Sequence, residues 1–369
     1  MNFNKEKILK ILPVFAAAVT LTIFYFVTFK LDTTFETNRE KIGFVITGDV
    51  TEKGWNGSHY NGIKKACEEL DLELLLREKI PEKSGKCSGA VQDLISQGAK
   101  IIFLMSFNYP AEVREIMDEH PNIYFVSIST LERAKNMTSC FARLYQGRYL
   151  SGVLAGKKTK TKNVGYVAAM QNSEVNRGIN AFALGVRRAN PDAKVFVIFT
   201  GAWQNEEVEA KNAETLIKNF GVDVLTYHQN GDTTGRVAEK FGVDFVGFNA
   251  ILENYSDHYL TSVICNWDLF YQDILKKHLK GELASTRNYW VGAQQGAVTL
   301  SEYSNAVDLQ ARLDINEIKH ELADNRNFIF ADEIFDNEGN LRCSKNQVIS
   351  DKELLKNIHW FVQGVEVVK

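Results

Sequence analysis

The feature that most constrains the fold is an alternation of short apolar runs with helical patterns, which occurs twice along the chain. The strand-length runs of the first half are 42–47, 73–77, 101–105 and 123–127. Those of the second half are 163–169, 193–199, 223–227 and 245–248. Strands that alternate with helices predict parallel sheets with helices on both faces. We therefore expect an α/β protein with two similar doubly wound halves and a cleft between them.

The loop after the first strand carries a candidate binding site. Residues 42–47 form the apolar run, and apolar residues recur at helical spacing from Ile63 onward. In open α/β sheets small molecules bind beyond the carboxyl ends of the strands, which is where Asp49, Trp55 and Asn56 fall. Trp55 either offers a flat ring for stacking a flat ligand or packs beneath its own helix. The sequence leaves both interpretations open.

Polar and aromatic residues also follow the other strands of the predicted sheets. They are Phe107 in the first half and Asn172, Trp203, Gln229 and Asn249 in the second. Trp203 occupies the position in the second half that Trp55 occupies in the first, so the two rings are candidates for a clamp around a planar ligand. The alternative is that Trp203 caps its own helix.

The beginning of the chain has the pattern of a membrane segment. Three lysines lie within residues 1–10, and residues 11–29 are uncharged and mostly apolar. That length is close to the roughly 20 residues that a spanning helix needs, and it exceeds the apolar region of a typical signal peptide. We interpret residues 1–30 as an uncleaved anchor in the cell membrane, with the remaining chain outside the cytoplasm. The alternative is that the segment is cleaved as a secretion signal. Residues 31–40 are polar, and we interpret them as a tether between the membrane and the folded part of the chain.

Composition and motifs argue against several other functions. With 43 Lys and Arg against 46 Asp and Glu, the net charge of −3 gives no indication of nucleic-acid binding. The five scattered cysteines predict neither a disulfide framework nor a metal site. Glycine-rich loops of the kind that hold dinucleotides or nucleotide phosphates are missing, so no cofactor is expected. Asp49 stands alone in its loop, and His59 and His228 sit where histidines usually bond locally, so we do not expect an enzyme.

Four segments together resemble the basic membrane protein family of PnrA-like substrate-binding lipoproteins. They are EKGWNGSHYNGIKKAC at 52–67, ARLYQGRYLSGVLAG at 142–156, SEVNRGINAFALGV at 173–186, and DNEGNLRC at 336–343 followed by SDKELL at 350–355. The resemblance implies a type I periplasmic-binding-protein fold that delivers purine nucleosides to the permease of an ABC importer. The family's lipid-carrying cysteine is missing, because no cysteine precedes Cys67.

The resemblance also implies site residues, and two of them depart from the family pattern. The family's acidic, aromatic and Asn loop falls on 52–56, and the aromatic residue of its facing domain falls on Trp203. The position of its ribose-binding acid is Asn249, and that of a basic residue is Gln294. An amide replaces a carboxylate at the first position, and a positive charge is lost at the second. The expected ligand is thus a purine nucleoside, a free base or another planar heterocycle. A membrane-tethered sensor that signals through a partner protein is the alternative function.

The order of elements predicts two lobes joined by three crossings of the chain, which would form a hinge. The first lobe is assigned residues 41–145 and 251–281, and the second residues 146–250 and 282–369. This division depends on a strand at 259–265, a helix at 269–279 and a strand at 289–292. Trp267 would then lie either at the cleft or in the core. The small residues at 147–156 predict a helix packed closely on a sheet.

Overall fold

A computed structural model of the chain describes residue 20 and residues 39–52, 54–128, 134–283, 288–324 and 329–369. The predicted membrane segment, residues 11–29, lies outside this set except for Thr20. None of the helices within the described ranges combines the length and apolar character needed to cross a bilayer. Residues Lys41–Lys369 form one compact unit, which contains both predicted halves.

The first half of the chain builds a parallel sheet with the strand order β11-β5-β4-β3-β1-β2. Its strands are β1 (Lys41–Val45), β2 (Glu73–Arg77), β3 (Ile101–Leu104), β4 (Tyr124–Ile128), β5 (Met137–Ala142) and β11 (Asn288–Val291). Its helices are α2 (Trp55–Glu69), α3 (Lys86–Ser96), α4 (Tyr109–Glu112), α5 (Arg114–Glu119) and α10 (Trp267–Leu279).

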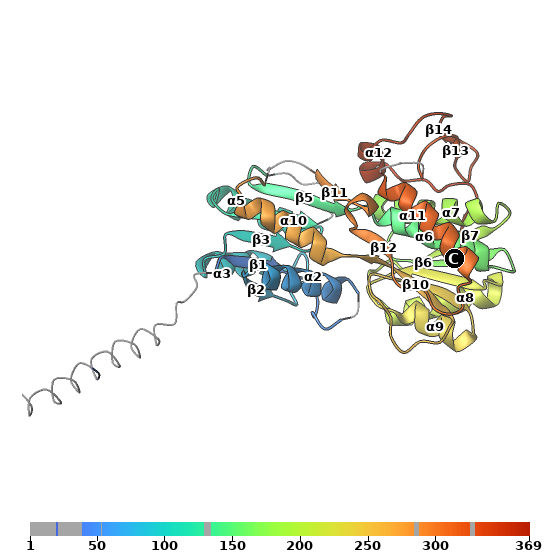
Figure 1. Ribbon diagram of the computed structural model, residues 1–369, viewed down its shortest axis with the longest axis horizontal. Coiled ribbons are helices and arrows are strands. Elements are labelled where there is room, and N and C mark those ends of the chain that lie inside the picture. The colour runs from blue at the N-terminus through green and yellow to red at the C-terminus, as the bar shows by residue number, and fades with distance from the viewer. Residues whose placement is uncertain (1–19, 21–38, 53, 129–133, 284–287, 325–328) are drawn as a thin grey trace, which may run out of the picture. The chain divides into compact units, whose positions relative to one another are not determined.

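Both faces of this sheet are covered, as its apolar strands require. Side chains alternate between the two faces of a strand. Accordingly, Phe44 packs with the cluster that includes α2 and α10, whereas Val45 packs with the cluster that includes α3 and α5. Figure 1 shows α2 and α10 lying together beside the sheet. The predicted α/β architecture with parallel sheets is confirmed.

The second half builds a sheet with the order β12-β10-β9-β8-β6-β7-β15, which is parallel except for the edge strand β12. Its strands are β6 (Asn163–Ala168), β7 (Lys194–Phe199), β8 (Val224–His228), β9 (Asp244–Phe248), β10 (Tyr259–Cys265), β12 (Val298–Leu300) and β15 (Val365–Val367). The helices and short elements of this half and the C-terminal part are α6 (Leu144–Lys158), α7 (Ser173–Ala189), α8 (Glu206–Phe220), α9 (Thr233–Phe241), η1 (Ala293–Gln295), α11 (Leu309–Ala323), β13 (Ile334–Phe335), β14 (Leu341–Cys343) and α12 (Asp351–Lys356).

The sheet membership of two late strands corrects the predicted lobe boundaries. β10, which lies in the segment 251–281 assigned to the first lobe, pairs with β9 in the second sheet. β11, which lies in the segment 282–369 assigned to the second lobe, pairs with β5 in the first sheet. The chain passes between the sheets after β5, after β10 and after β11. An apolar run predicts a strand but not its partner, because pairing depends on residues far away in the sequence.

The small residues at 147–156 pack a helix against another helix as well as against the sheet. A Cβ atom on Gly152 of α6 would lie 2.1 Å from the carbonyl oxygen of Phe182 in α7, and one on Gly185 of α7 would lie 2.2 Å from that of Tyr149. Gly147 meets the sheet instead, since its Cβ would lie 2.7 Å from Val263. Glycines thus allow α6 and α7 to approach backbone to backbone. The predicted contact with the sheet therefore holds for only part of the segment.

We expect Gly152→Ala to lower the free energy of unfolding by about 1–3 kcal/mol, because the added methyl group would overlap the backbone of α7. Gly89→Ala is a matched control in helix α3, where nothing lies within 4 Å of the added Cβ. That variant should be neutral or slightly stabilising, since Ala favours helices over Gly. Urea denaturation of both variants measures the difference. Equal effects of the two substitutions would show that the close contact is not important.

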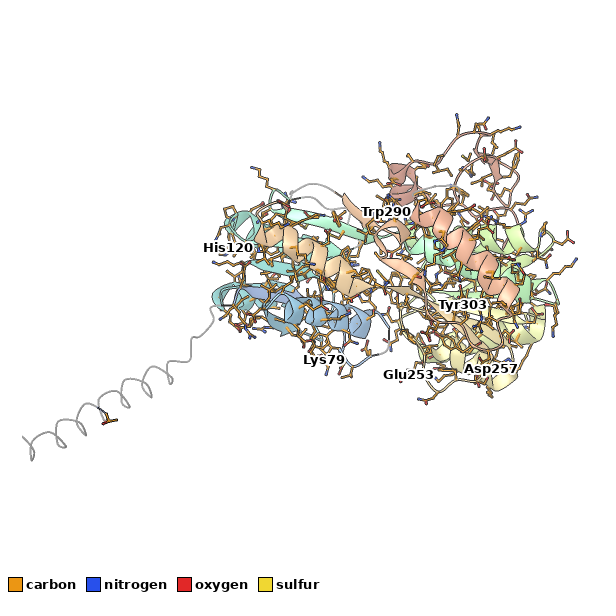
Figure 2. All side chains as sticks on the ribbon, in the orientation of Figure 1. Lys79, His120, Glu253, Asp257, Trp290 and Tyr303 are labelled. Atoms are coloured by element: carbon orange, nitrogen blue, oxygen red, sulfur yellow. The ribbon has the colours of Figure 1, made fainter. Side chains whose placement is uncertain are left out.

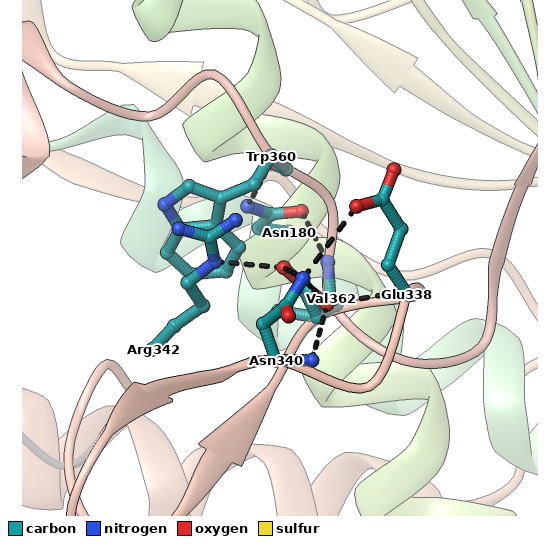
Figure 3. A network of polar contacts seen from close by, with 7 residues as sticks. Asn180, Glu338, Asn340, Arg342, Trp360 and Val362 are labelled. Atoms are coloured by element: carbon teal, nitrogen blue, oxygen red, sulfur yellow. Dashed lines mark hydrogen bonds and ion pairs between the residues drawn. The ribbon is translucent and has the colours of Figure 1, made fainter.

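Polar side chains of α7 hold the C-terminal segment by its backbone. Asn180 donates to the carbonyl oxygen of Trp360 at 3.0 Å and accepts from the amide of Val362 at 3.0 Å. Asn176 and Arg177 donate to the carbonyl oxygens of Ile358 and Leu354, at 2.9 and 2.6 Å. Beside this segment, the buried carboxylate of Asp336 accepts hydrogen bonds from Asn340 and Arg342 (Figure 3). Burial raises the pKa of Asp336, but the hydrogen bonds of Asn340, Arg342 and Glu338 outweigh it and lower that pKa to about 2.

Candidate functional site

A cavity of about 750 Å³ lies at the carboxyl ends of the strands of both sheets. Its walls come from the loops that follow these strands, from the start of α7 and from the C-terminal segment. Its lining residues are Thr47, Trp55, Glu82, Lys83, Met105, Ser106, Phe107, Asn108, Phe141, Leu144, Met170, Gln171, Asn172, Ser173, Glu174, Arg177, Trp203, His228, Asn230, Phe248, Asn249, Leu355, Lys356 and His359. A volume of this size suits a small organic molecule.

Trp55 forms part of the wall on the side of the first sheet. Its indole N–H donates to the carbonyl oxygen of Met105 at 3.3 Å, and its ring lies 4.0 Å from that of His59, centroid to centroid. The His59 ring in turn lies 3.8 Å from that of Trp267, which is a core residue. The Nδ1 atom of His59 is 2.6 Å from the hydroxyl of Tyr271. These contacts fix the orientation of a half-buried Trp55, which packs on its neighbours and still lines the cavity.

The wall on the side of the second sheet contains Trp203, His228, Phe248 and Asn249. The His228 ring lies 4.5 Å from that of Phe248 and 6.0 Å from that of Trp203. Trp203 is half-buried, and its carbonyl oxygen accepts the amide of Asn230 at 2.9 Å. Trp203 does not cap α8, because Asn205 does so by accepting from the amide of Val208. Trp203 thus lines the cavity from the second half of the chain, and Trp55 lines it from the first.

Buried arginines set the charge of this second wall. Arg177 of α7 lines the cavity and is only 3% exposed. Arg148 of α6 lies behind Phe248, with its guanidinium 3.8 Å from the centre of that ring. Burial and then the charges of Arg148 and Arg177 hold the pKa of His228 well below its usual value. The His228 ring is therefore neutral at physiological pH.

The two halves touch at Gly54, the residue before α2. A Cβ atom on Gly54 would lie 1.8 Å from the carbonyl oxygen of Asn230, which follows β8. Gly54 also has a φ of +140°, a value that residues with a side chain rarely adopt. Glycine is thus required here on both counts, and its small size lets the loop that carries Trp55 approach the second wall.

Five of the nine residues predicted from the sequence line the cavity: Trp55, Phe107, Asn172, Trp203 and Asn249. Phe107 is 53% exposed at the first sheet, and Asn172 caps α7 by accepting from the amide of Val175. Asn249 follows β9 with a φ of +63°, and its side-chain oxygen is buried with no partner among the described residues.

The other four predicted residues have different roles in the structure. Asp49 pairs with Lys79 at 2.7 Å, and this ion pair, with the hydrogen bonds from Thr51, lowers the pKa of Asp49 (Lys79 is labelled in Figure 2). Asn56 is buried and holds its own loop, accepting from the amide of Gly48 at 3.2 Å.

Gln229 and Gln294 also lie away from the cavity lining. Gln229 is buried and donates to the hydroxyl of Thr200 at 2.9 Å, because it points to the opposite face of the strand end from His228. Gln294 is exposed in η1, and its side-chain oxygen accepts from the side-chain amide of Gln295. The corrections at Asp49, Asn56 and Gln229 share a cause: residues adjacent in a loop turn in different directions, and only some face the cavity.

Several lining residues were not predicted. His228 is adjacent to the predicted Gln229, and alternation along a strand shows that only one of the two faces the cavity without showing which. Arg177 lies one helical turn after Ser173, the neighbour of the predicted Asn172, which offered a signal once α7 was placed. Leu355, Lys356 and His359 gave no local signal, because the C-terminal segment reaches the cavity only through its long-range bonds to α7.

We expect the protein to lose stability below about pH 6.5, the usual pKa of an unfolded histidine. Burial holds the pKa values of His59 and His228 well below 6.5 in the folded state, so the unfolded chain binds these protons first. As the pH is lowered, the free energy of unfolding then decreases by up to about 1.4 kcal/mol per pH unit for each histidine, until the pKa of that histidine in the folded state is reached. Melting temperatures between pH 7.5 and 5.5 measure this loss. His59→Asn, which cannot be protonated, should reduce it, and an unchanged pH dependence would contradict the assignment.

Comparisons with known proteins agree with this architecture. The profile of the family described as "ABC transporter substrate-binding protein PnrA-like" matches residues 39–327. A purine-binding protein of Brucella abortus is 29% identical over 88% of this chain and 93% of its own length. A putative ABC transporter glucose-binding protein of Haloferax volcanii is 28% identical over 88% and 79%. A transcriptional activator of the comK gene from Bacillus halodurans has a similar structure, with a TM-score of 0.69, 23% identity and coverage of 78% of this chain and 99% of its own. This chain belongs to the PnrA-like family of ABC transporter substrate-binding proteins.

Proposed function

We propose that the protein binds a purine nucleoside or a related planar heterocycle in the cavity and delivers it to the permease of an ABC importer. The observation that carries this proposal is the position of Trp55 and Trp203. Each is half-buried, each lines the cavity, and they come from different sheets, with Trp55 after β1 and Trp203 after β7. Tryptophan rings stack favourably on planar molecules. The purine-binding relative from Brucella abortus supports the same class of ligand.

The polar groups of the cavity fit a base better than they fit a ribose. Asn249 stands where the family has a ribose-binding acid, and its amide cannot accept hydrogen bonds at both ends. Gln294, at the position of the family's basic residue, does not line the cavity. Stacking of a planar base on the two tryptophan rings therefore has more support than recognition of a ribose. The glucose-binding relative makes glucose the necessary comparison.

A thermal-shift screen of the full chain tests the ligand class. The probes are purine bases, purine nucleosides and glucose. A ligand at a hundredfold excess over its Kd stabilises the folded state by about 2.7 kcal/mol, which is readily detected. We expect bases or nucleosides to raise the melting temperature and glucose to leave it unchanged. A shift with glucose alone would contradict the proposal, and so would the absence of any shift.

We further propose that residues 11–29 anchor the protein in the cell membrane, with the binding unit outside the cytoplasm. The uncharged length of this segment and the lysines before it support the proposal. The protein should stay with the membrane fraction after a high-salt wash, and its N-terminus should still be Met1. A mature N-terminus between residues 30 and 41 would instead identify a secretion signal.

A sensor that signals through a partner protein is the second candidate function. It is favoured by the structural similarity to a transcriptional activator, which shows that this fold also occurs in regulators. Uptake measurements separate the two functions. Deletion of the gene should abolish uptake of a radiolabelled purine if the protein serves an importer. Unchanged uptake with altered transcription would favour the sensor.

A further inference from the structure

His228 is a buried polar side chain that no other described residue binds. It ends β8, it lines the cavity, and it is 6% exposed. Its Nδ1 atom is buried with no hydrogen-bond partner, and no described residue bonds to its Nε2 atom. Because a buried polar side chain without partners costs free energy, a hydrogen bond from a ligand to the ring nitrogen that reaches the cavity would be favourable.

The Nδ1 side of His228 faces helix α7 and two polar side chains. A Cβ atom on Gly178 would lie 3.6 Å from Nδ1, 3.6 Å from the hydroxyl of Tyr166 and 3.8 Å from Cγ of Arg148. Three side chains therefore meet where α7 has no side chain of its own. Nδ1 is turned towards this group, and the opposite side of the ring is left for the cavity.

The charge of Arg148 determines which ring nitrogen carries the hydrogen. Arg148 is fully buried and donates to Thr226 at 3.2 Å and to the carbonyl oxygen of Tyr227 at 2.7 Å. No carboxylate pairs with it within the described ranges. A nearby cation favours a lone pair on the nitrogen that faces it and disfavours an N–H there. Nδ1 is thus the acceptor nitrogen of the neutral ring, and Nε2 carries the hydrogen.

Arg177 gives the same wall a second donor. Its guanidinium has only N–H groups, and one of them bonds to the carbonyl oxygen of Leu354 at 2.6 Å. Asn249 can present either end of its amide and so fits both donors and acceptors. Glu174, at the first turn of α7, is the acidic side chain that lines this side of the cavity, and it is less buried than Arg177. His228 and Arg177, two of the most buried polar side chains of this wall, therefore both offer hydrogen-bond donors.

We propose that His228 is a specificity-determining residue, which donates from Nε2 to an exocyclic carbonyl oxygen of a purine ring. This proposal rests on the proposed function and narrows its ligand class to oxopurines. An oxo group accepts hydrogen bonds, whereas an amino group at the same position points its own hydrogens at those of His228 and Arg177. Sites built around buried hydrogen bonds reject analogues that leave them unpaired.

Calorimetric titration of the full chain with hypoxanthine and with adenine tests this inference. In hypoxanthine an oxo group replaces the exocyclic amino group of adenine, and the adjacent ring nitrogen N1 carries a hydrogen instead of a lone pair. We expect hypoxanthine to bind at least tenfold more tightly than adenine. His228→Leu, which removes the donor, should bring the two affinities to within about threefold, mainly by weakening hypoxanthine. His228→Gln retains an N–H donor and should keep most of the preference.

The ratio of the affinities for hypoxanthine and adenine in the wild-type protein tests the role of His228 even if a variant fails to fold. Equal or tighter binding of adenine would overturn the role of His228 and leave the proposed function intact. A preference for hypoxanthine that persists in a folded His228→Leu variant would also overturn it. Failure of both bases and of their nucleosides to bind would contradict the proposed function, and this inference with it.

Discussion

Trp203→Ala should weaken ligand binding more than tenfold while leaving the fold nearly as stable as before. A tenfold loss corresponds to about 1.4 kcal/mol, which removal of one stacking face readily exceeds when the covered area is included. Trp203 is half-buried, and its nearest aromatic ring, that of His228, lies 6.0 Å away. Replacing it with Ala should therefore lower the free energy of unfolding by well under the roughly 3–5 kcal/mol typical of a buried Trp.

Trp55→Ala should weaken binding similarly but also lower stability. The Trp55 ring packs 4.0 Å from His59 and donates to Met105, so its removal leaves a gap in a packed cluster. Phe335→Ala is the control, since Phe335 lies on β13 and does not line the cavity. Calorimetry with the ligand and denaturation without it separate the two effects. Near-normal affinity in both Trp variants, together with lower melting temperatures, would assign the rings to packing alone.

A second large loss of affinity is expected for Gly54→Ala. The added Cβ would stand 1.8 Å from the carbonyl oxygen of Asn230, so the loop that carries Trp55 must retreat from the second wall. We expect the Kd to rise more than tenfold, because the arrangement of the two walls that can grip a ligand becomes a minor state. Calorimetric titration with the best ligand of the screen measures the change.

Gly85→Ala separates the clash from the backbone strain. Gly85 also has a positive φ, +73°, but nothing lies within 4 Å of its added Cβ. Both substitutions should cost some stability, since residues with a side chain are strained at such angles. Only Gly54→Ala should lower affinity. If both variants bind normally, the contact with Asn230 has no part in ligand binding.

The sequence predicted the elements of the fold well because their periodicity is local. The run 42–47 and the helical spacing from Ile63 needed no knowledge of distant residues. The sheet membership of β10 and β11 was wrong, because the partners of a strand are decided by packing across the whole molecule.

The candidate site was predictable to a similar extent. The strand-end rule placed Trp55, Trp203 and Asn249 at one cavity, since carboxyl ends of parallel strands share an edge. The rule predicts which loops border the cavity, however, and not which side chains within each loop point into it. It could not separate His228 from Gln229 without the register of β8. Residues from the C-terminal segment lay beyond any local pattern.

The bonds between α7 and the C-terminal segment have a consequence for the order in which the protein becomes functional. Leu355, Lys356 and His359 line the cavity, and β15, the edge strand of the second sheet, follows them in the chain. The backbone groups that bond to Asn176, Arg177 and Asn180 follow these residues of α7 by 177 to 182 positions. They are therefore synthesised long after α7 itself. Until this late segment docks on α7 the cavity lacks part of its lining, and ligand capture depends on that docking.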